Sequence, residues 1–154
     1  MEEKKIIIQD ILALKGQRKI TMLTAYDYPL ASLIDKAGID MILVGDSVAN
    51  VVLGLDSTTK VGMTEMIHHA KAVTRAVKHA LVIGDMPYEA YQVNPQESVK
   101  NAQRFIDEAK CGAVKLEWFD RCLEVTEQII KAGISVMGHI GLTPQTADKL
   151  GGFK

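Results

Sequence analysis

The sequence predicts an α/β fold in which five parallel strands alternate with helices. One recurring order supports this prediction: a helix-like segment ends in Ala-Gly or Cys-Gly, a short β-rich run follows, and a polar residue closes the run. A second observation is a lysine in the last turn of these helices, where a positive charge complements the helix dipole. Strands that alternate with helices pair in parallel through right-handed crossovers.

Each predicted element is bounded by residues that start or stop regular structure. Glycine just past a helix adopts the left-handed conformation that ends it, and a capping residue followed by proline begins a helix. The glycines in question are Gly38, Gly112 and Gly133, and the starts are Asn94-Pro95 and Thr143-Pro144. The predicted strands are residues 20–24, 39–44, 80–83, 113–116 and 134–137. The predicted helices are residues 28–37, 64–77, 95–110 and 120–132, with an amphipathic leader at 6–14 and a sixth helix from Thr143-Pro144.

Composition narrows the class of protein. The 154 residues contain no linker or low-complexity tract and predict a single domain, 1–154. Eighteen Lys and Arg balance nineteen Asp and Glu, so no basic excess indicates a nucleic-acid partner. The longest apolar runs are too short to span a membrane, and the charged N-terminus does not resemble a signal peptide. Two cysteines without a CxxC pattern fit a reducing compartment, which predicts a cytoplasmic protein.

Two architectures accommodate five β/α units. A doubly wound open sheet is complete at this length. A (β/α)₈ barrel takes about 250 residues, and five units make up five-eighths of it. Length alone therefore favours the open sheet. In both architectures ligands bind at the carboxyl ends of the strands.

Polar residues close the predicted strands. Because side chains alternate along a strand, Asp46 is expected on the face of Ile42 and Val44, and Asp85 on the face of Leu81 and Ile83. Lys115 shares a face with Glu117 by the same rule. The strand ends together collect Asp27, Asp46, Ser47, Asp85, Lys115, Glu117 and His139.

A group of carboxylates beside one lysine and one histidine predicts a cation site. Like charges repel unless a cation joins them, and oxygen ligands suit Mg²⁺, which keeps positions for water or substrate. Lys115 is then placed to hold a substrate carboxylate. The competing interpretation is that each Asp only caps the helix after its strand, the commoner role for any single Asp. That interpretation gives no role to Lys115 or His139.

Another histidine pair is weaker evidence for a metal. His68 and His69 stand at helical spacing from Glu65, but their order does not match the HExxH motif. We expect them on the solvent side of the helix at 64–77. No GxGxxG or Walker motif indicates a nucleotide site.

The strand-end motifs resemble the ketopantoate hydroxymethyltransferase family over about residues 20–154. The matching motifs are Val44-Gly45-Asp46-Ser47, Leu53-Gly54-Leu55-Asp56-Ser57-Thr58, Gly84-Asp85-Met86-Pro87-Tyr88, Val114-Lys115-Leu116-Glu117 and, most specifically, Gly138-His139-Ile140-Gly141-Leu142-Thr143-Pro144-Gln145. The resemblance implies a (β/α)₈ TIM barrel related to the phosphoenolpyruvate mutase and isocitrate lyase barrels. It reverses the preference for the open sheet and implies that this domain is a truncated barrel.

The resemblance also implies an enzyme of pantothenate and coenzyme A biosynthesis. Such an enzyme transfers a one-carbon unit from 5,10-methylenetetrahydrofolate to 3-methyl-2-oxobutanoate, giving 2-dehydropantoate (ketopantoate) by Mg²⁺-assisted enolate formation. A homo-oligomer is implied, which is a decamer in the family. The implied metal ligands are Asp46, Asp85 and Glu117, the last directly or through water. The implied substrate-binding residues are Asp46, Ser47, Asp85 and Lys115. The implied catalytic residues are Lys115 and His139.

The chain departs from the family pattern in three ways. The family's general-base Glu lies on a later strand, beyond Lys154. After Ser57-Thr58 the family usually has Leu-Pro, whereas this chain has Thr59-Lys60-Val61-Gly62. At position 55 the family commonly has an aromatic residue or His, whereas this chain has Leu55. Three hypotheses follow. The chain is the amino-terminal part of the enzyme, a product that binds Mg²⁺ and oxoacid without catalysis, or another phosphoenolpyruvate mutase-like enzyme of 2-oxoacids.

Overall fold

A five-stranded parallel sheet forms the centre of the protein in the computed structural model, which describes residues 4–150. The strands are β1 (Met22–Thr24), β2 (Met41–Val44), β3 (Leu81–Asp85), β4 (Ala113–Glu117) and β5 (Val136–His139). Each strand pairs in parallel with the next one in the chain, in the order β1-β2-β3-β4-β5. A doubly wound sheet reverses its strand order at a switch point, whereas a barrel does not. The sequential order therefore confirms the barrel-type prediction over the open sheet.

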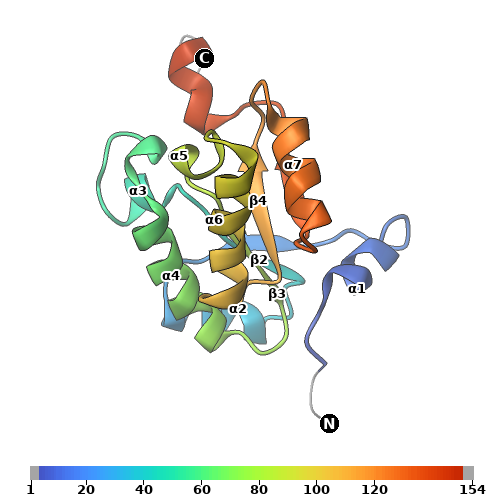
Figure 1. The fold of residues 1–154 in the computed structure, drawn as a ribbon. Coiled ribbons are helices and arrows are strands. Elements are labelled where there is room, and N and C mark those ends of the chain that lie inside the picture. The colour runs from blue at the N-terminus through green and yellow to red at the C-terminus, as the bar shows by residue number, and fades with distance from the viewer. Residues whose placement is uncertain (1–3, 151–154) are drawn as a thin grey trace.

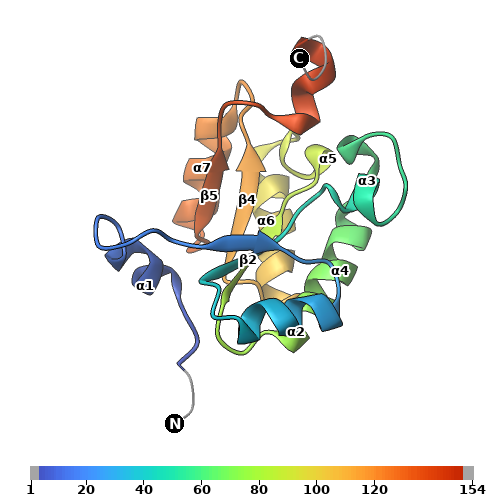
Figure 2. The same cartoon turned by 180° about the vertical axis from the view of Figure 1, so that it is seen from behind.

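The helices between the strands lie on one face of the sheet (Figures 1 and 2). They are α2 (Tyr28–Lys36), α4 (Met63–Ala76), α6 (Pro95–Asp107) and α7 (Cys122–Lys131). Alternate strand residues such as Ile42, Val82 and Val114 pack against them in the larger core. This alternation leaves the other side chains of each strand on the opposite, inner face.

The inner face carries a smaller apolar cluster at the amino ends of the strands. Helix α1 (Ile8–Ala13) places Ile11 against Met41, Leu81, Ile83 and Ala113. Helix α1 therefore packs against this end of the inner face. The inner-face rows of β3 and β4 continue past these apolar residues toward the carboxyl ends of the strands.

Several boundaries differ from the predicted ones. Strands β3, β4 and β5 include the polar residues that end them, Asp85, Glu117 and His139. Three short elements carry too few residues for a periodic pattern and were not predicted. These are α3 (Val48–Val51), η1 (Thr58–Lys60) and α5 (Tyr88–Tyr91). The predicted sixth helix is a 3₁₀ helix, η2 (Pro144–Leu150).

The sheet is not closed within the described residues. There, β1 pairs only with β2, and β5 pairs only with β4. The three residues of β1 are exposed, as expected for a strand with one neighbour. Within residues 4–150, no helix combines the length and apolar character needed to cross a membrane.

The pairing register aligns the inner-face rows at the carboxyl edge. Asp85 is paired with Lys115, and Glu117 is paired with His139. Paired residues on adjacent strands point to the same face, so these four side chains are brought together by the sheet itself.

Gly84 tests how closely α6 packs on the strand that carries Asp85. A Cβ at Gly84 would lie 2.2 Å from Cδ1 of the buried Phe105 ring. We expect Gly84→Ala to lower the free energy of unfolding by about 1–3 kcal/mol, measured by urea denaturation. Gly138→Ala on β5 is the matched control, because its Cβ meets nothing within 4 Å. Equal effects of the two substitutions would contradict the close packing of Phe105 on β3.

Candidate functional site

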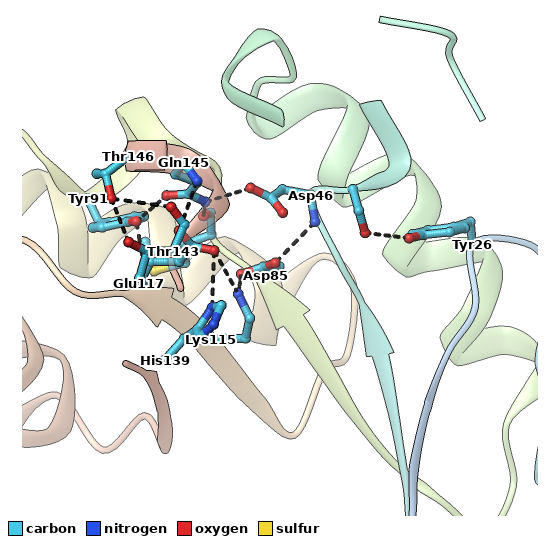
Figure 3. Close-up of polar contacts among 12 residues, drawn as sticks. Tyr26, Asp46, Asp85, Tyr91, Lys115, Glu117, His139, Thr143, Gln145 and Thr146 are labelled. Atoms are coloured by element: carbon cyan, nitrogen blue, oxygen red, sulfur yellow. Dashed lines mark hydrogen bonds and ion pairs between the residues drawn. The ribbon is translucent and has the colours of Figure 1, made fainter. Parts of the chain in front are cut away.

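A buried cluster of charged side chains lies at the carboxyl ends of β3, β4 and β5 (Figure 3). Asp85, Glu117 and His139 are the last residues of these strands, and Lys115 precedes Glu117 by two positions. Only 1% of Asp85, 1% of Glu117 and 8% of Lys115 is exposed. His139 is the most accessible member, with 31% of its side chain exposed.

Lys115 lies between two carboxylates. Its Nζ donates to Asp85 Oδ1 at 2.7 Å and lies 3.9 Å from Glu117 Oε1. The same Glu117 oxygen lies 3.1 Å from His139 Nδ1. When Glu117 is ionised it only accepts hydrogen bonds, and Nδ1 of His139 then carries the proton of this contact. The arrangement holds one ammonium and one imidazole against acidic groups on neighbouring strands.

Asp46 joins the cluster from outside the sheet. Its backbone N–H donates to Asp85 Oδ2 at 3.1 Å, and its own Oδ2 accepts from Gln145 Nε2 at 2.7 Å. The strand rule placed Asp46 on the face of Ile42 and Val44, but those residues pack against the helices. The prediction of a shared face is wrong for Asp46, because the chain turns after Val44 and leaves the alternation of the strand.

The charges of the cluster do not balance. Three buried carboxylates, on Asp46, Asp85 and Glu117, face the single ammonium of Lys115. Burial raises the pKa of Asp85, an effect that the Lys115 charge opposes and the Asp46 charge reinforces. Burial also raises the pKa of Glu117, although the Gln145 N–H and Lys115 oppose that shift. The excess of negative charge makes the site suited to a cation.

Ser47 is held at the edge of this cluster. Its hydroxyl lies 2.6 Å from the hydroxyl of Tyr26, which Figure 3 shows on the Asp46 side of the site. The Tyr26 carbonyl accepts from His69 Nδ1 at 2.8 Å, so His69 is partly buried and His68 alone is exposed. The expectation that both histidines face solvent is therefore wrong for His69.

Asp27 does not belong to the site. It is exposed and caps α2, with its Oδ1 accepting from the Leu30 N–H at 2.8 Å. The capping interpretation is thus correct for Asp27. Neither Asp46 nor Asp85 caps the short helix that follows its strand.

Sequence reasoning missed two polar residues that contact the cluster. Gln145 lies on η2 beyond β5, and the buried Tyr91 lies on α5. Gln145 is the last residue of the motif that begins at Gly138. The motif could have indicated Gln145, but no role was predicted for this residue. Tyr91 carries no such signal, because an aromatic residue on a four-residue helix has no periodic pattern around it.

The donor set fits Mg²⁺ by chemical type. Within the described chain, no three His, Cys, Asp or Glu side chains are grouped as a ready metal-binding set. Mg²⁺ commonly takes one or two protein carboxylates and completes its shell with water and substrate. Asp46 and Asp85, joined by a hydrogen bond, supply such a pair.

Solved structures define the class of fold. A 2,3-dimethylmalate lyase, described as a PEP mutase/isocitrate lyase superfamily member, matches with a TM-score of 0.65 at 16% identity, over 82% of this chain and 49% of that chain. An oxaloacetate acetylhydrolase matches with a TM-score of 0.66 at 12% identity, over 84% of this chain and 51% of that chain. The chain therefore has the barrel-type α/β fold of that superfamily, with its sheet open in the described part.

Sequence comparison identifies the family. The sequence model of ketopantoate hydroxymethyltransferase matches residues 5–154, so the chain belongs to that family. The 3-methyl-2-oxobutanoate hydroxymethyltransferase of Syntrophomonas wolfei is 58% identical over 140 residues, which are 91% of this chain and 51% of the relative. That of Syntrophobacter fumaroxidans is 54% identical over 152 residues, 99% of this chain and 54% of the relative. The chain spans about half the length of these curated relatives.

The charge excess predicts a pH-dependent effect of removing Lys115. Lys115→Met leaves the buried carboxylates unpaired, so we expect about 3–5 kcal/mol less unfolding free energy at pH 8. The folded-state pKa values of Asp85 and Glu117 are above their ordinary values, and losing Lys115 raises them further. Stability contributed by the protonated carboxyls is present at low pH and lost as pH rises through the raised pKa values. The deficit should therefore be smaller at pH 5.

Urea denaturation without divalent metal measures both values. Lys100→Met is the matched control, because Lys100 is exposed and pairs with Glu97 at 3.3 Å on the surface of α6. That substitution should change stability by less than about 1 kcal/mol at either pH. A Lys115→Met deficit that is equal at pH 5 and pH 8 would show that charge imbalance does not govern the cluster.

Proposed function

We propose that this chain supplies the Mg²⁺-binding and oxoacid-binding part of a 3-methyl-2-oxobutanoate hydroxymethyltransferase. The observation that carries the proposal is the buried cluster at the strand ends, where Lys115 is held between carboxylates that outnumber it. The names of the relatives supply the substrate. The site supplies the two kinds of charge that a 2-oxoacid and a divalent cation need.

Asp46 and Asp85 are the proposed direct ligands of Mg²⁺. Glu117, whose oxygens accept from His139 and from the Gln145 N–H, is the proposed further ligand, directly or through water. When bound, Mg²⁺ supplies positive charge next to the keto oxygen of the oxoacid.

Lys115 is the proposed partner of the substrate carboxylate. Its ammonium is nearly buried and aimed at the carboxyl edge of the sheet, where its present partner is Asp85. A cation that shared the charge of Asp85 would leave the ammonium available to an anionic substrate. Ser47 offers a hydroxyl on the Asp46 side, oriented by Tyr26. Fixed donors of this kind stabilise negative charge as it develops on the oxoacid.

His139 is proposed to line the substrate side of the site. Glu117 fixes its Nδ1, which directs the second ring nitrogen away from the carboxylate. In the full reaction a base removes the C3 proton of the oxoacid, and C3 forms a bond to the one-carbon unit of 5,10-methylenetetrahydrofolate. The two bonds from that carbon to the folate nitrogens break, water supplies the hydroxyl group, and tetrahydrofolate leaves with the protons. His139 acts here as a hydrogen-bonding residue and not as that base.

An adjacent cleft offers room for a second, larger substrate. The cleft has a volume of about 460 Å³. One of its lining residues is Trp118, which directly follows Glu117 in the sequence. Its other lining residues include Phe119, Arg121 and Thr143. The aromatic side chains and the adjacent position support this cleft as the approach of the folate co-substrate.

Exposed apolar side chains support a homo-oligomer as the proposed assembly. Tyr28, Leu30 and Leu33 all lie on α2 and are 55%, 43% and 65% exposed. Large apolar side chains exposed together are typical of an interaction surface. A cytoplasmic location is part of the same proposal, in keeping with biosynthetic chemistry on small molecules.

Titration with Mn²⁺ tests the metal site. We expect the chain to bind Mn²⁺, detected by the loss of the free-ion electron paramagnetic resonance signal. Asp46→Asn/Asp85→Asn should weaken binding by more than about 100-fold, beyond the range typical of changes outside the direct ligands. Asp27→Asn is the control, because Asp27 is an exposed capping residue. Equal Mn²⁺ binding by the native chain and the double variant would refute the assignment of these two ligands.

A further inference from the structure

The geometry points to Gln145 as a positioning residue that aligns Asp46 and Glu117, and to Tyr91 as the residue that fixes the Gln145 amide. This inference rests on the proposed function, because it concerns the carboxylates of the same site. Gln145 is 5% exposed and Tyr91 is fully buried, so both belong to the interior of the protein.

Gln145 contacts two carboxylates, Asp46 in the turn after β2 and Glu117 at the end of β4. Its backbone N–H donates to Glu117 Oε2 at 3.0 Å. Its side-chain Nε2 donates to Asp46 Oδ2 at 2.7 Å and to the Met86 carbonyl at 3.2 Å. Figure 3 shows Gln145 between Asp46 and Glu117. One residue therefore bridges the ends of β2 and β4 across the site.

The orientation of the Gln145 amide is fixed by its neighbours. The Asp46 carboxylate and the Met86 carbonyl offer acceptors, so the NH₂ group must face them. Oε1 then points to the Tyr91 hydroxyl, which donates to it. A flipped amide would place its oxygen against both acceptors, which is unfavourable.

Tyr91 connects the amide to the strand that bears Glu117. Its hydroxyl accepts a hydrogen bond from the Glu117 N–H at 3.3 Å while it donates to Gln145. The Tyr91 ring packs edge-on against Phe119, with 5.2 Å between ring centroids. The hydroxyl is thus held by its ring contact and by two hydrogen bonds.

The turn that carries Gln145 is closed by its own hydrogen bonds. The hydroxyls of Thr143 and Thr146 lie 2.6 Å apart, and the Thr146 N–H donates to the Thr143 carbonyl at 3.0 Å. Gln145 lies between them, so its backbone N–H is directed at Glu117 before any ligand binds.

Carboxylates that repel one another need such donors to hold a defined position. Oδ2 of Asp46 accepts the hydrogen bond from Gln145 Nε2. Oδ1 of Asp46 is therefore the oxygen that we assign to the cation. Groups that orient a metal ligand through hydrogen bonds commonly change metal affinity or activity by about 10–100-fold when they are removed. Gln145 acts through Asp46 and Glu117 and does not itself touch the cation.

Mn²⁺ binding to variants of the 154-residue chain tests this role. Gln145→Met keeps the length of the side chain and the backbone N–H but removes the amide. We expect it to weaken Mn²⁺ binding by about 10–100-fold. Gln103→Met is the matched control, because Gln103 Nε2 donates to the Asp107 carboxylate at 2.9 Å on the surface of α6. The control should bind Mn²⁺ within twofold of the native chain.

A double-variant comparison tests the part played by Tyr91. Tyr91→Phe removes the donor to Oε1 and should weaken Mn²⁺ binding, but by less than Gln145→Met. In the Gln145→Met background the same change should have a much smaller effect, because the amide that it acts through is gone. Additive effects would overturn the link between Tyr91 and Gln145.

A spectroscopic measurement covers a variant that fails to fold. In the native chain, the side-chain amide protons of Gln145 should give two separate nuclear magnetic resonance signals that exchange slowly with water and shift on addition of Mg²⁺. Rapid exchange, or signals that do not respond to Mg²⁺, would overturn the inference.

The outcomes separate the two proposals. Native binding of Mn²⁺ with equal binding by Gln145→Met would overturn the role of Gln145 and leave the metal site standing. Absence of Mn²⁺ binding by the native chain would overturn both.

Discussion

The ion pair between Lys115 and Asp85 is the interaction on which the rest of the site depends. It lies inside a parallel sheet, where desolvating two charges costs several kcal/mol per ion unless other groups satisfy them. The sheet register makes the pair unavoidable, because it aligns Asp85 with Lys115 on adjacent strands. Asp46 and Glu117 then add two more buried carboxylates, and the surroundings must hold them apart and neutralise them.

The neighbouring structure can be understood as a response to that constraint. The Asp46 N–H, the Gln145 amide and the His139 ring each donate to one of the carboxylates. Gly84 lets Phe105 pack directly on β3, so that α6 closes over the strand that carries Asp85. These contacts leave the cluster with an excess of negative charge. In the proposed function a divalent cation supplies the missing positive charge, and the same cluster binds the cation through Asp46 and Asp85 and the oxoacid through Lys115.

The sequence predicted the parts of this site that follow a period. Side chains alternate along a strand, and this period predicted which polar residues share the inner face at the strand ends. The structure places these residues, Asp85, Lys115 and Glu117, together. Asp27 and Asp46 both follow strands and could not be distinguished by pattern. Only the tertiary turn makes Asp27 a helix cap and brings Asp46 to Gln145. The length of the chain favoured an open sheet, but the strand order is that of the barrel type. Length indicates how many strands there are, and it does not indicate which strands pair with one another. Tyr91 could not be predicted, since its contacts link residues far apart in the chain.

Calorimetric titration of 3-methyl-2-oxobutanoate into the chain, with and without Mg²⁺, tests most directly whether the cluster is a joint site for cation and oxoacid. We expect Mg²⁺ to strengthen oxoacid binding, and Lys115→Ala to weaken the Mg²⁺-supported binding by about 1.5–3 kcal/mol, the range for hydrogen bonds to charged groups. Lys100→Ala, which changes an exposed lysine, should leave it unaltered. Oxoacid affinity that is the same with and without Mg²⁺, and the same in Lys115→Ala, would contradict a joint site.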